Sequence, residues 1–207
     1  MKVRKPQLLL QNLETIGRNN GDIGKTRMRL DKSKAFKRQR IVYLIPTVEP
    51  IFPKVYLSHL NLAFPPNNAV VRIVADGLEV GEAYSTAVEQ ILAHPTLSDF
   101  EYLLTIEADN CPPPDGVLQL IERMEANPRF ACIGGLYFTK GIGGSPQIWG
   151  DPADPVLNFR PQLPDSGGGL VDCCGTGMGF NLWSLKMFKD KKLRRPWFVT
   201  QKKNGIA

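Results

Sequence analysis

Short apolar runs separated by amphipathic stretches make up most of the chain after its first forty residues. The run at 41–45 is uncharged and ends at a proline, and the run at 102–106 is uncharged and ends at an acidic residue. Uninterrupted apolar runs of this length are typical of strands that are buried on both faces of a parallel sheet. Between them, Ala83, Ala87 and Ile91 recur at helical spacing and predict a helix with one apolar side.

The predicted elements form an alternating series of strands and helices. In chain order they are strand 41–45, helix 51–64, strand 69–75, helix 82–93, strand 102–106, a helix that contains Leu118, Ile121 and Met124 and stops at Asn127, strand 130–138, strand 170–174 and helix 184–188. Such alternation predicts an α/β fold, with a mostly parallel central sheet flanked by helices and right-handed crossovers. The intervening segment 141–169 is rich in Gly, Pro and Asp, and long ordered loops of this kind are usually functional.

Charge divides the chain into a basic N-terminal leader and a larger domain. Residues 1–40 carry twelve Lys and Arg against three Asp and Glu, whereas the remaining residues carry fourteen against seventeen. The leader, 1–38, shows no sustained hydrophobic period, so we expect a partly disordered extension before a domain at 39–207. Its positive charge permits weak contact with an anionic surface or with nucleic acid, although a solvated tail explains the same composition.

The sequence has neither a long apolar run nor metal-ligand spacing of its cysteines, and both points limit the location and the chemistry that we expect. No apolar run approaches the roughly 20 residues that cross a bilayer, and the run at 8–10 is too short for a signal peptide. We therefore expect a cytoplasmic protein without a transmembrane segment. The four cysteines follow no metal-ligand spacing, which argues against a zinc site. We expect Cys173 and Cys174 to be small buried residues of the strand 170–174.

Two acidic residues, Glu107 and Asp109, come directly after the apolar run at 102–106. Ligands of open α/β sheets bind at the carboxyl ends of the strands, which is where this position falls. Residues i and i+2 of an extended segment point to the same side, so both carboxylates are expected to face one point. Their oxygens suit Mg²⁺ or Mn²⁺, which also bind diphosphate, although acid-x-acid triplets also occur at ordinary strand ends.

The stretch 102–110, followed by Pro112 and Pro113, resembles the metal-binding segment of GT-A-fold glycosyltransferases of the family-2-like type that is common in phage and bacterial genomes. Further stretches agree with that family in order and spacing: 45–47, 134–137, and 175–183 together with 196–198. The resemblance implies a Rossmann-like GT-A fold and a glycosyltransferase that moves a sugar from a nucleoside-diphosphate sugar, with Mn²⁺ or Mg²⁺. The acceptor, whether glycan, lipid, protein or nucleic acid, is not implied.

The resemblance and the positions at strand ends together predict the residues of a metal- and donor-binding site. Glu107 and Asp109 are the expected metal ligands. The expected donor-binding residues are Pro46, Thr47, Asp76, Glu107, Gly175 and Gly177. Asp76 and the glycines also have structural explanations, as a turn residue before Gly77 and as parts of a glycine-rich turn. Asp172 is the candidate for a catalytic base near the acceptor.

The chain departs from the family pattern in two places. The family usually has Asp where this chain has Glu107, whose extra methylene moves the carboxylate outward by about 1.5 Å. In the family an acidic pair and then a His follow the Pro-Trp-Phe region, and this sequence ends at Ala207, about where they begin. We therefore expect a GT-A-like domain without its C-terminal portion, as a fragment, a split gene product or a degenerate relative.

Three other functions are alternatives to a complete enzyme. The first is a catalytically incomplete GT-A-like module that binds a nucleotide sugar, which the missing acidic pair and His favour. The second is a sugar nucleotidyltransferase, but the segment 46–50 stands where that class has a Gly-rich loop with an Arg. The third is a nucleic-acid-binding protein acting through the leader, which lacks interleaved aromatic residues for base stacking.

Overall fold

The computed structural model describes residues 40–65, 69–141, 143–156, 158–163 and 169–201, together with Lys25 and Met28. The predicted leader otherwise lies outside the described residues. The helices and strands are β1 (Ile41–Thr47), α3 (Pro53–Leu60), β2 (Val70–Asp76), α4 (Val80–Ala93), η2 (Leu97–Asp99), β3 (Tyr102–Ile106), α5 (Gly116–Ala126), β4 (Cys132–Gly134), β5 (Ile148–Trp149), β6 (Gly175–Thr176), β7 (Phe180–Ser184) and α6 (Leu185–Phe188). None of the helices within the described ranges has the length and apolarity needed to cross a bilayer.

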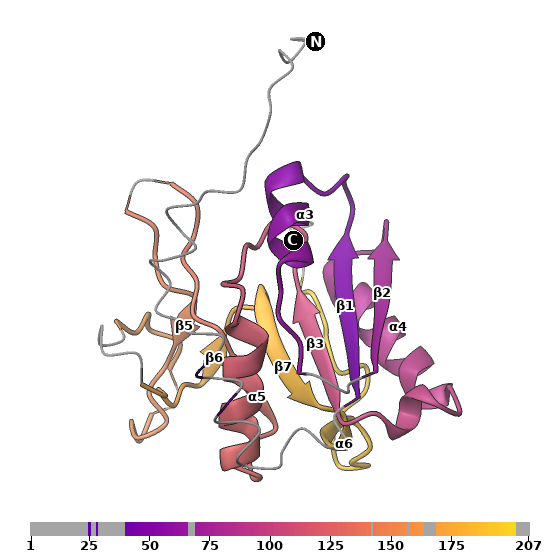
Figure 1. Ribbon diagram of the computed structural model, residues 1–207. Helices are drawn as coiled ribbons and strands as arrows, with labels where there is room; N and C mark the ends of the chain where they lie inside the picture. The colour runs from indigo at the N-terminus through magenta and orange to yellow at the C-terminus, as the bar shows by residue number, and fades with distance from the viewer. Residues whose placement is uncertain are drawn as a thin grey trace, which may run out of the picture.

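The central sheet has five strands in the order β2-β1-β3-β7-β4. Figure 1 shows β2, β1, β3 and β7 side by side in this order. β1 pairs in parallel with β2 on one side and with β3 on the other. β7 lies antiparallel to both β3 and β4, so the other four strands share one direction. The predicted α/β class is therefore confirmed, as a mixed sheet flanked by helices.

Side-chain alternation along β1 explains why helices cover both faces of the sheet. Ile41, Tyr43 and Ile45 belong to a core cluster that includes the apolar side of α5. Val42 and Leu44 belong to a second cluster with residues of α4 and α6. All five side chains are buried, and Figure 1 shows α5 and α4 on opposite sides of the sheet. A strand covered on both faces leaves no side for charged residues, which accounts for its uninterrupted apolar run.

The strand predicted at 130–138 is paired with the sheet only over β4. Beyond it, the Gly135 N–H donates to the Phe180 carbonyl over 2.8 Å. A Cβ atom on Gly135 would lie 2.3 Å from the Phe180 ring, so only glycine allows this close passage. The chain then leaves the sheet, and the apolar residues that follow β4 do not extend it.

The C-terminal part of the predicted series needs two corrections. The predicted strand 170–174 was wrong, because pairing begins at β6, and Cys173 and Cys174 are half-buried outside any strand. The segment 180–184 forms β7, which the sequence did not predict, whereas the helix predicted at 184–188 is confirmed as α6. β7 buries the polar side chain of Asn181 between apolar neighbours, so its sequence has no continuous apolar run.

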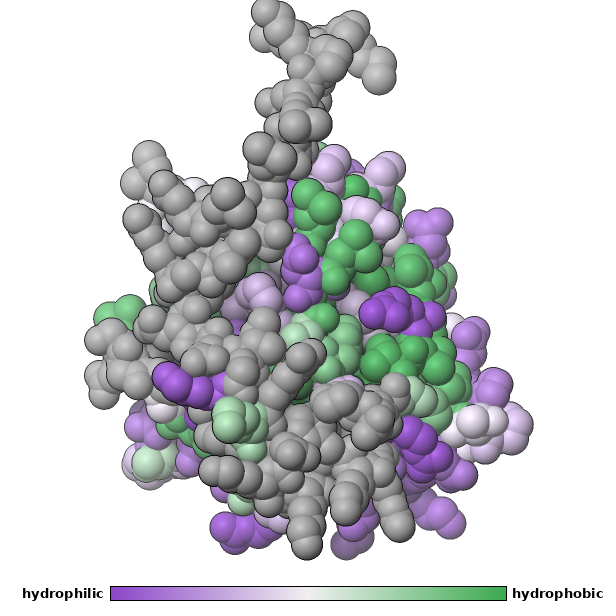
Figure 2. All heavy atoms as spheres, in the orientation of Figure 1, coloured by the Kyte–Doolittle hydropathy of each residue, from purple (hydrophilic) through white to green (hydrophobic). Residues whose placement is uncertain are grey.

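Apolar side chains are exposed on the face shown in Figure 2, around α3 and the edge strand β2. Tyr56 and Leu60 of α3 and Val74 of β2 are exposed. Arg72 of β2 places its guanidinium 5.5 Å from the centroid of the Phe64 ring. A charged residue on an edge strand opposes pairing with another chain.

The described chain ends in a segment, 197–200, that lies against α4. The Ser85 hydroxyl donates to the Phe198 carbonyl over 3.0 Å, and the Phe198 N–H donates to the same hydroxyl oxygen over 3.1 Å. The Phe198 ring lies 5.5 Å from Trp183 of β7 between centroids. This C-terminal segment therefore connects the start of α4 with the antiparallel strand.

Candidate functional site

The carboxyl ends of β1 and β2 are aligned at one edge of the sheet. Thr47, the last residue of β1, is paired with Asp76, the last residue of β2. The Gly77 N–H donates to the Thr47 carbonyl over 2.9 Å, and Gly77 adopts φ 73°, which favours glycine. A cavity of about 460 Å³ lies at this edge, a volume typical of small-molecule sites.

Three strand or helix ends and one loop residue line this cavity. Its lining residues are Pro46 and Thr47 at the end of β1, Val48, Glu49, Pro50 and Phe52 after it, Leu78, Glu79 and Val80 at the start of α4, Glu107, Ala108 and Asp109 after β3, and Lys140. Four predicted site residues, Pro46, Thr47, Glu107 and Asp109, are therefore brought together in one cavity.

A turn, and not an extended strand, places Glu107 and Asp109. β3 ends at Ile106, and the Glu107 N–H donates to the Gly179 carbonyl over 3.1 Å. The Asn110 N–H donates back to the Glu107 carbonyl over 3.0 Å, which closes a β-turn. Both carboxylates line one cavity, as predicted, but the predicted reason, alternation along an extended strand, was wrong. The chain turns directly after β3, and this turn brings the two residues together.

The two carboxylates affect each other electrostatically. Burial, and then the charge of Asp109, raise the pKa of the Glu107 carboxyl above its ordinary value. Two neighbouring carboxylates repel unless a cation lies between them. Their hard oxygen atoms at the wall of an open cavity fit Mg²⁺ or Mn²⁺, which need only one or two protein carboxylates. Over the described ranges no group of three or more His, Cys, Asp or Glu side chains is placed to hold a metal.

His59 supports the turn from α3. Its Nε2 lies 3.0 Å from the Asn110 carbonyl oxygen, and its side chain is buried. Burial lowers the pKa of His59, and the contact with Asn110 opposes that shift. The neutral ring therefore positions the backbone beside Asp109, and His59 is not among the cavity-lining residues.

The glycine-rich stretch before β7 packs closely around Tyr137. The Gly179 N–H donates to the Tyr137 hydroxyl oxygen over 3.1 Å. A Cβ on Gly177 would lie 2.2 Å from that hydroxyl oxygen, and one on Gly179 would lie 2.2 Å from the Asn110 amide nitrogen. Gly175 has only ordinary contacts, the nearest at 3.4 Å from Phe159. Close packing therefore requires Gly177 and Gly179 but not Gly175.

Four predicted site residues are not among those that line the carboxylate cavity. Asp172 and Gly175 line a second cavity of about 680 Å³, which also includes residues of α5 and β4. Asp76 is exposed at the end of β2, and neither cavity includes it or Gly177 among its lining residues.

The second cavity is also lined by Cys132, whose pKa burial raises to about 12. Its thiol therefore stays protonated at neutral pH.

Sequence reasoning missed Glu79 and Lys140. The Glu79 carboxylate accepts hydrogen bonds from the Gly81 and Glu82 N–H groups, so it caps α4, and it also accepts one from the Thr200 hydroxyl. An acid just before a helix is a signal that sequence reasoning can use. The Lys140 ammonium donates to the Asp109 carboxylate over 2.8 Å. No sequence motif predicts that contact.

Comparisons with known proteins assign no family to this fold and site. No protein-family model matches the chain, and a search of curated proteins finds no match either. The fold and the site define an α/β domain with a mixed five-stranded sheet and with two carboxylates at a cavity beside the carboxyl ends of its parallel strands.

Proposed function

We propose that this chain is a GT-A-like domain that binds a nucleoside-diphosphate sugar and serves glycosyl transfer with Mg²⁺ or Mn²⁺. The observation that carries the proposal is the convergence of Glu107 and Asp109 on one cavity at the ligand-binding edge of an α/β sheet. The resemblance of the 102–110 stretch to the family's metal-binding segment supports the same function independently of the cavity.

Glu107 and Asp109 would hold the metal, with water and phosphate oxygens completing its coordination. A divalent ion in this position neutralises the charge that develops on a departing diphosphate. Burial first, and then the charge of Asp109, raise the pKa of Glu107, and this is consistent with the role, since a buried carboxylate beside another carboxylate gains from a shared cation.

Apolar residues beside the carboxylates suit the nucleoside part of the donor. Phe52, Val48 and Val80 line the cavity and are exposed to solvent. A partly exposed aromatic ring offers a face on which a base can stack. The cavity thus combines an apolar wall for a base with acidic and basic groups for a metal-bound diphosphate.

A non-catalytic module is the second candidate, and the position of the acids favours it. During transfer the acceptor hydroxyl attacks the anomeric carbon, the bond to the diphosphate breaks, and a base takes the hydroxyl proton. Asp172, the predicted base, lines the second cavity. Glu79 lines the first, but the hydrogen bond from the Thr200 hydroxyl, more than any other cause, lowers its pKa and weakens it as a base.

Calorimetric titration of the full chain with UDP and GDP, with and without Mn²⁺, tests the proposal. We expect binding that requires Mn²⁺ and that Glu107→Gln weakens at least about tenfold, or about 1.4 kcal/mol. Glu89→Gln is the matched control, because Glu89 is exposed on α4 and lies outside the cavity lining. A folded wild-type chain without metal-dependent nucleotide binding would overturn the proposal.

NMR detection of free sugar or glycosylated product from UDP-sugar and GDP-sugar donors separates the two candidates. Turnover by the full chain excludes the non-catalytic module. Metal-dependent binding without turnover across donors and acceptors supports it.

A further inference from the structure

Of the described residues that line the carboxylate cavity, Lys140 is the one with a basic side chain. Its ammonium nitrogen lies 2.8 Å from Oδ2 of Asp109. The Lys140 side chain is 77% exposed and that of Asp109 is 52% exposed, so solvent and other ions reach the pair. Such exposed ion pairs are weak and exchange partners easily.

The backbone on either side of Lys140 holds the residue over the cavity. The Thr139 N–H donates to the Ser145 carbonyl over 3.0 Å, and the Ser145 N–H donates to the Thr139 hydroxyl oxygen over 2.8 Å. Gly141 has φ 114°, a conformation that favours glycine, directly after Lys140. The ends of this loop are therefore fixed, while the lysine has a long side chain with several rotatable bonds.

A metal ion and the Lys140 ammonium would compete for the same carboxylate. A divalent ion held by Glu107 and Asp109 would need the Asp109 carboxylate that the lysine contacts, and the two positive charges would repel each other. The released ammonium then lies beside the cavity in which the proposed diphosphate binds. Lysine is a common phosphate ligand and needs no fixed geometry to act as one.

We propose that Lys140 is a tethered cation that occupies Asp109 in the metal-free protein and moves to a phosphate oxygen when the metal and diphosphate bind. This inference rests on the proposed function, since it assigns the diphosphate to the same cavity. Lys140 thus opposes the binding of metal alone and favours the binding of metal together with diphosphate. It makes the carboxylate pair selective for a metal-bound ligand.

The test measures two affinities for the full chain and for Lys140→Met, which keeps an apolar side chain of similar length. In a Mn²⁺ titration we expect the variant to bind about two- to fivefold more tightly, because an exposed competing cation is gone. In a titration with the preformed Mn²⁺ complex of inorganic diphosphate, we expect it to bind about tenfold more weakly, because a charged hydrogen bond is lost.

Lys54→Met is the control, because Lys54 is an exposed lysine of α3 that does not line the cavity, and it should change neither affinity. Opposite shifts in the two titrations support the inference, since a merely structural surface pair would shift neither. A Lys140→Met variant whose Mn²⁺ affinity is unchanged, lower or undetectable overturns it, as does one whose affinity for Mn²⁺-diphosphate is unchanged.

The two proposals fail in different ways. If the opposite shifts appear but neither UDP nor GDP binds, the proposed function is wrong and the role of Lys140 stands for a different diphosphate. If UDP or GDP binds in a metal-dependent way and the shifts are absent, only the role of Lys140 is wrong.

Discussion

Glu107 is the residue at which the requirements of folding and of binding conflict. Its pKa is raised in the folded chain by burial and by Asp109. Below the ordinary carboxyl pKa both the folded and the unfolded chain hold the proton. As the pH rises from there through the raised folded value, the unfolded chain ionises first, so stability is progressively lost and remains lost at neutral pH.

Glu107→Gln should therefore stabilise the free protein at neutral pH although it weakens metal-dependent binding. We expect an unfolding midpoint on the order of 2 °C higher than wild type at pH 7.5, and no difference at about pH 3, where the carboxyl is protonated in both the folded and the unfolded chain. Thermal unfolding followed by circular dichroism measures both values, with Glu89→Gln as the control. A variant that is less stable than wild type at pH 7.5 contradicts the electrostatic description of this site.

Residues at strand ends could be predicted, whereas residues brought in by loops could not. Glu107 and Asp109 follow the buried strand β3, Thr47 ends the buried strand β1, and parallel neighbours end at the same sheet edge. Lys140 reaches Asp109 from 31 positions away through a loop whose path no local pattern specifies. Asp172 lies near a segment rich in Gly and Pro, where no local pattern predicts the cavity that it lines.

The antiparallel strand β7 is the element that completes the site. Because β7 is antiparallel to β3, its first residue, Phe180, is paired with the last residue of β3, Ile106. The glycine-rich stretch that precedes β7 therefore lies at the edge of the sheet where the carboxylates lie. The hydrogen bond from the Glu107 N–H to the Gly179 carbonyl follows directly from this arrangement.

The chain that follows β4 passes close to β7 at Gly135, and the added methyl group of an alanine at this position tests that contact. A Cβ on Gly135 would lie 2.3 Å from the ring of Phe180, a buried residue of β7. We expect Gly135→Ala to lower the free energy of unfolding by about 1–3 kcal/mol, as overpacking does elsewhere. Urea denaturation measures it. Gly169→Ala, which meets nothing within 4 Å, is the control, and equal effects of the two changes would disprove the described packing.

Strands covered on both faces could be predicted, and β7 could not. β1 and β3 contain no charged residue, because helices pack on both of their faces. β7 buries Asn181, whose side-chain amide donates to the Gly177 carbonyl over 2.9 Å. A polar residue that finds its partner in a neighbouring turn interrupts the apolar pattern, so the strand is visible only once the fold is known.

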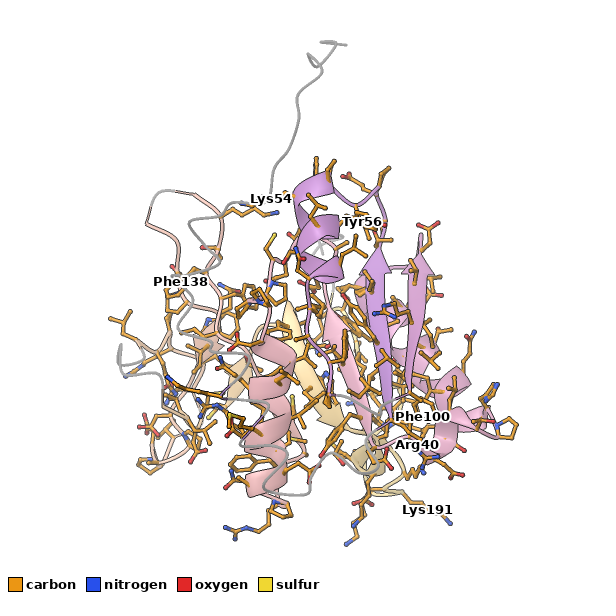
Figure 3. All side chains as sticks on the ribbon, viewed as in Figure 1. Arg40, Lys54, Tyr56, Phe100, Phe138 and Lys191 are labelled. Atoms are coloured by element: carbon orange, nitrogen blue, oxygen red, sulfur yellow. The ribbon has the colours of Figure 1, made fainter. Side chains whose placement is uncertain are left out.

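Charge is distributed unevenly over the whole molecule. Residues 41–185 carry six Lys and Arg against sixteen Asp and Glu, whereas 186–195 carry six against one. Figure 3 shows Lys191 at the opposite end of the molecule from Lys54 and Tyr56 of α3. Phe52, which lines the cavity, directly precedes α3, so this basic segment projects from the end away from the cavity.

Binding to anionic surfaces should therefore depend on both basic parts of the sequence. We expect the full chain to bind vesicles that contain anionic lipid at low salt, and a chain of residues 39–207 to bind at least tenfold more weakly but detectably, at about 1 kcal/mol for each lysine or arginine near the surface. Co-sedimentation at rising salt measures this, and vesicles of neutral lipid are the control. Equal binding of the two chains would exclude a contribution from the leader.

The C-terminal segment 197–200 gives the molecule a built-in optical reporter. Thr200 is hydrogen-bonded to Glu79, a residue of the cavity wall, and Phe198 of the same segment packs edge-on against Trp183. Trp197, in this segment, lies 5.8 Å from Phe188 between ring centroids. Of the three tryptophans of the chain, Trp197 belongs to the C-terminal segment and Trp183 packs against it. Because this segment is hydrogen-bonded to the cavity wall, intrinsic fluorescence can follow ligand binding in the cavity without a label.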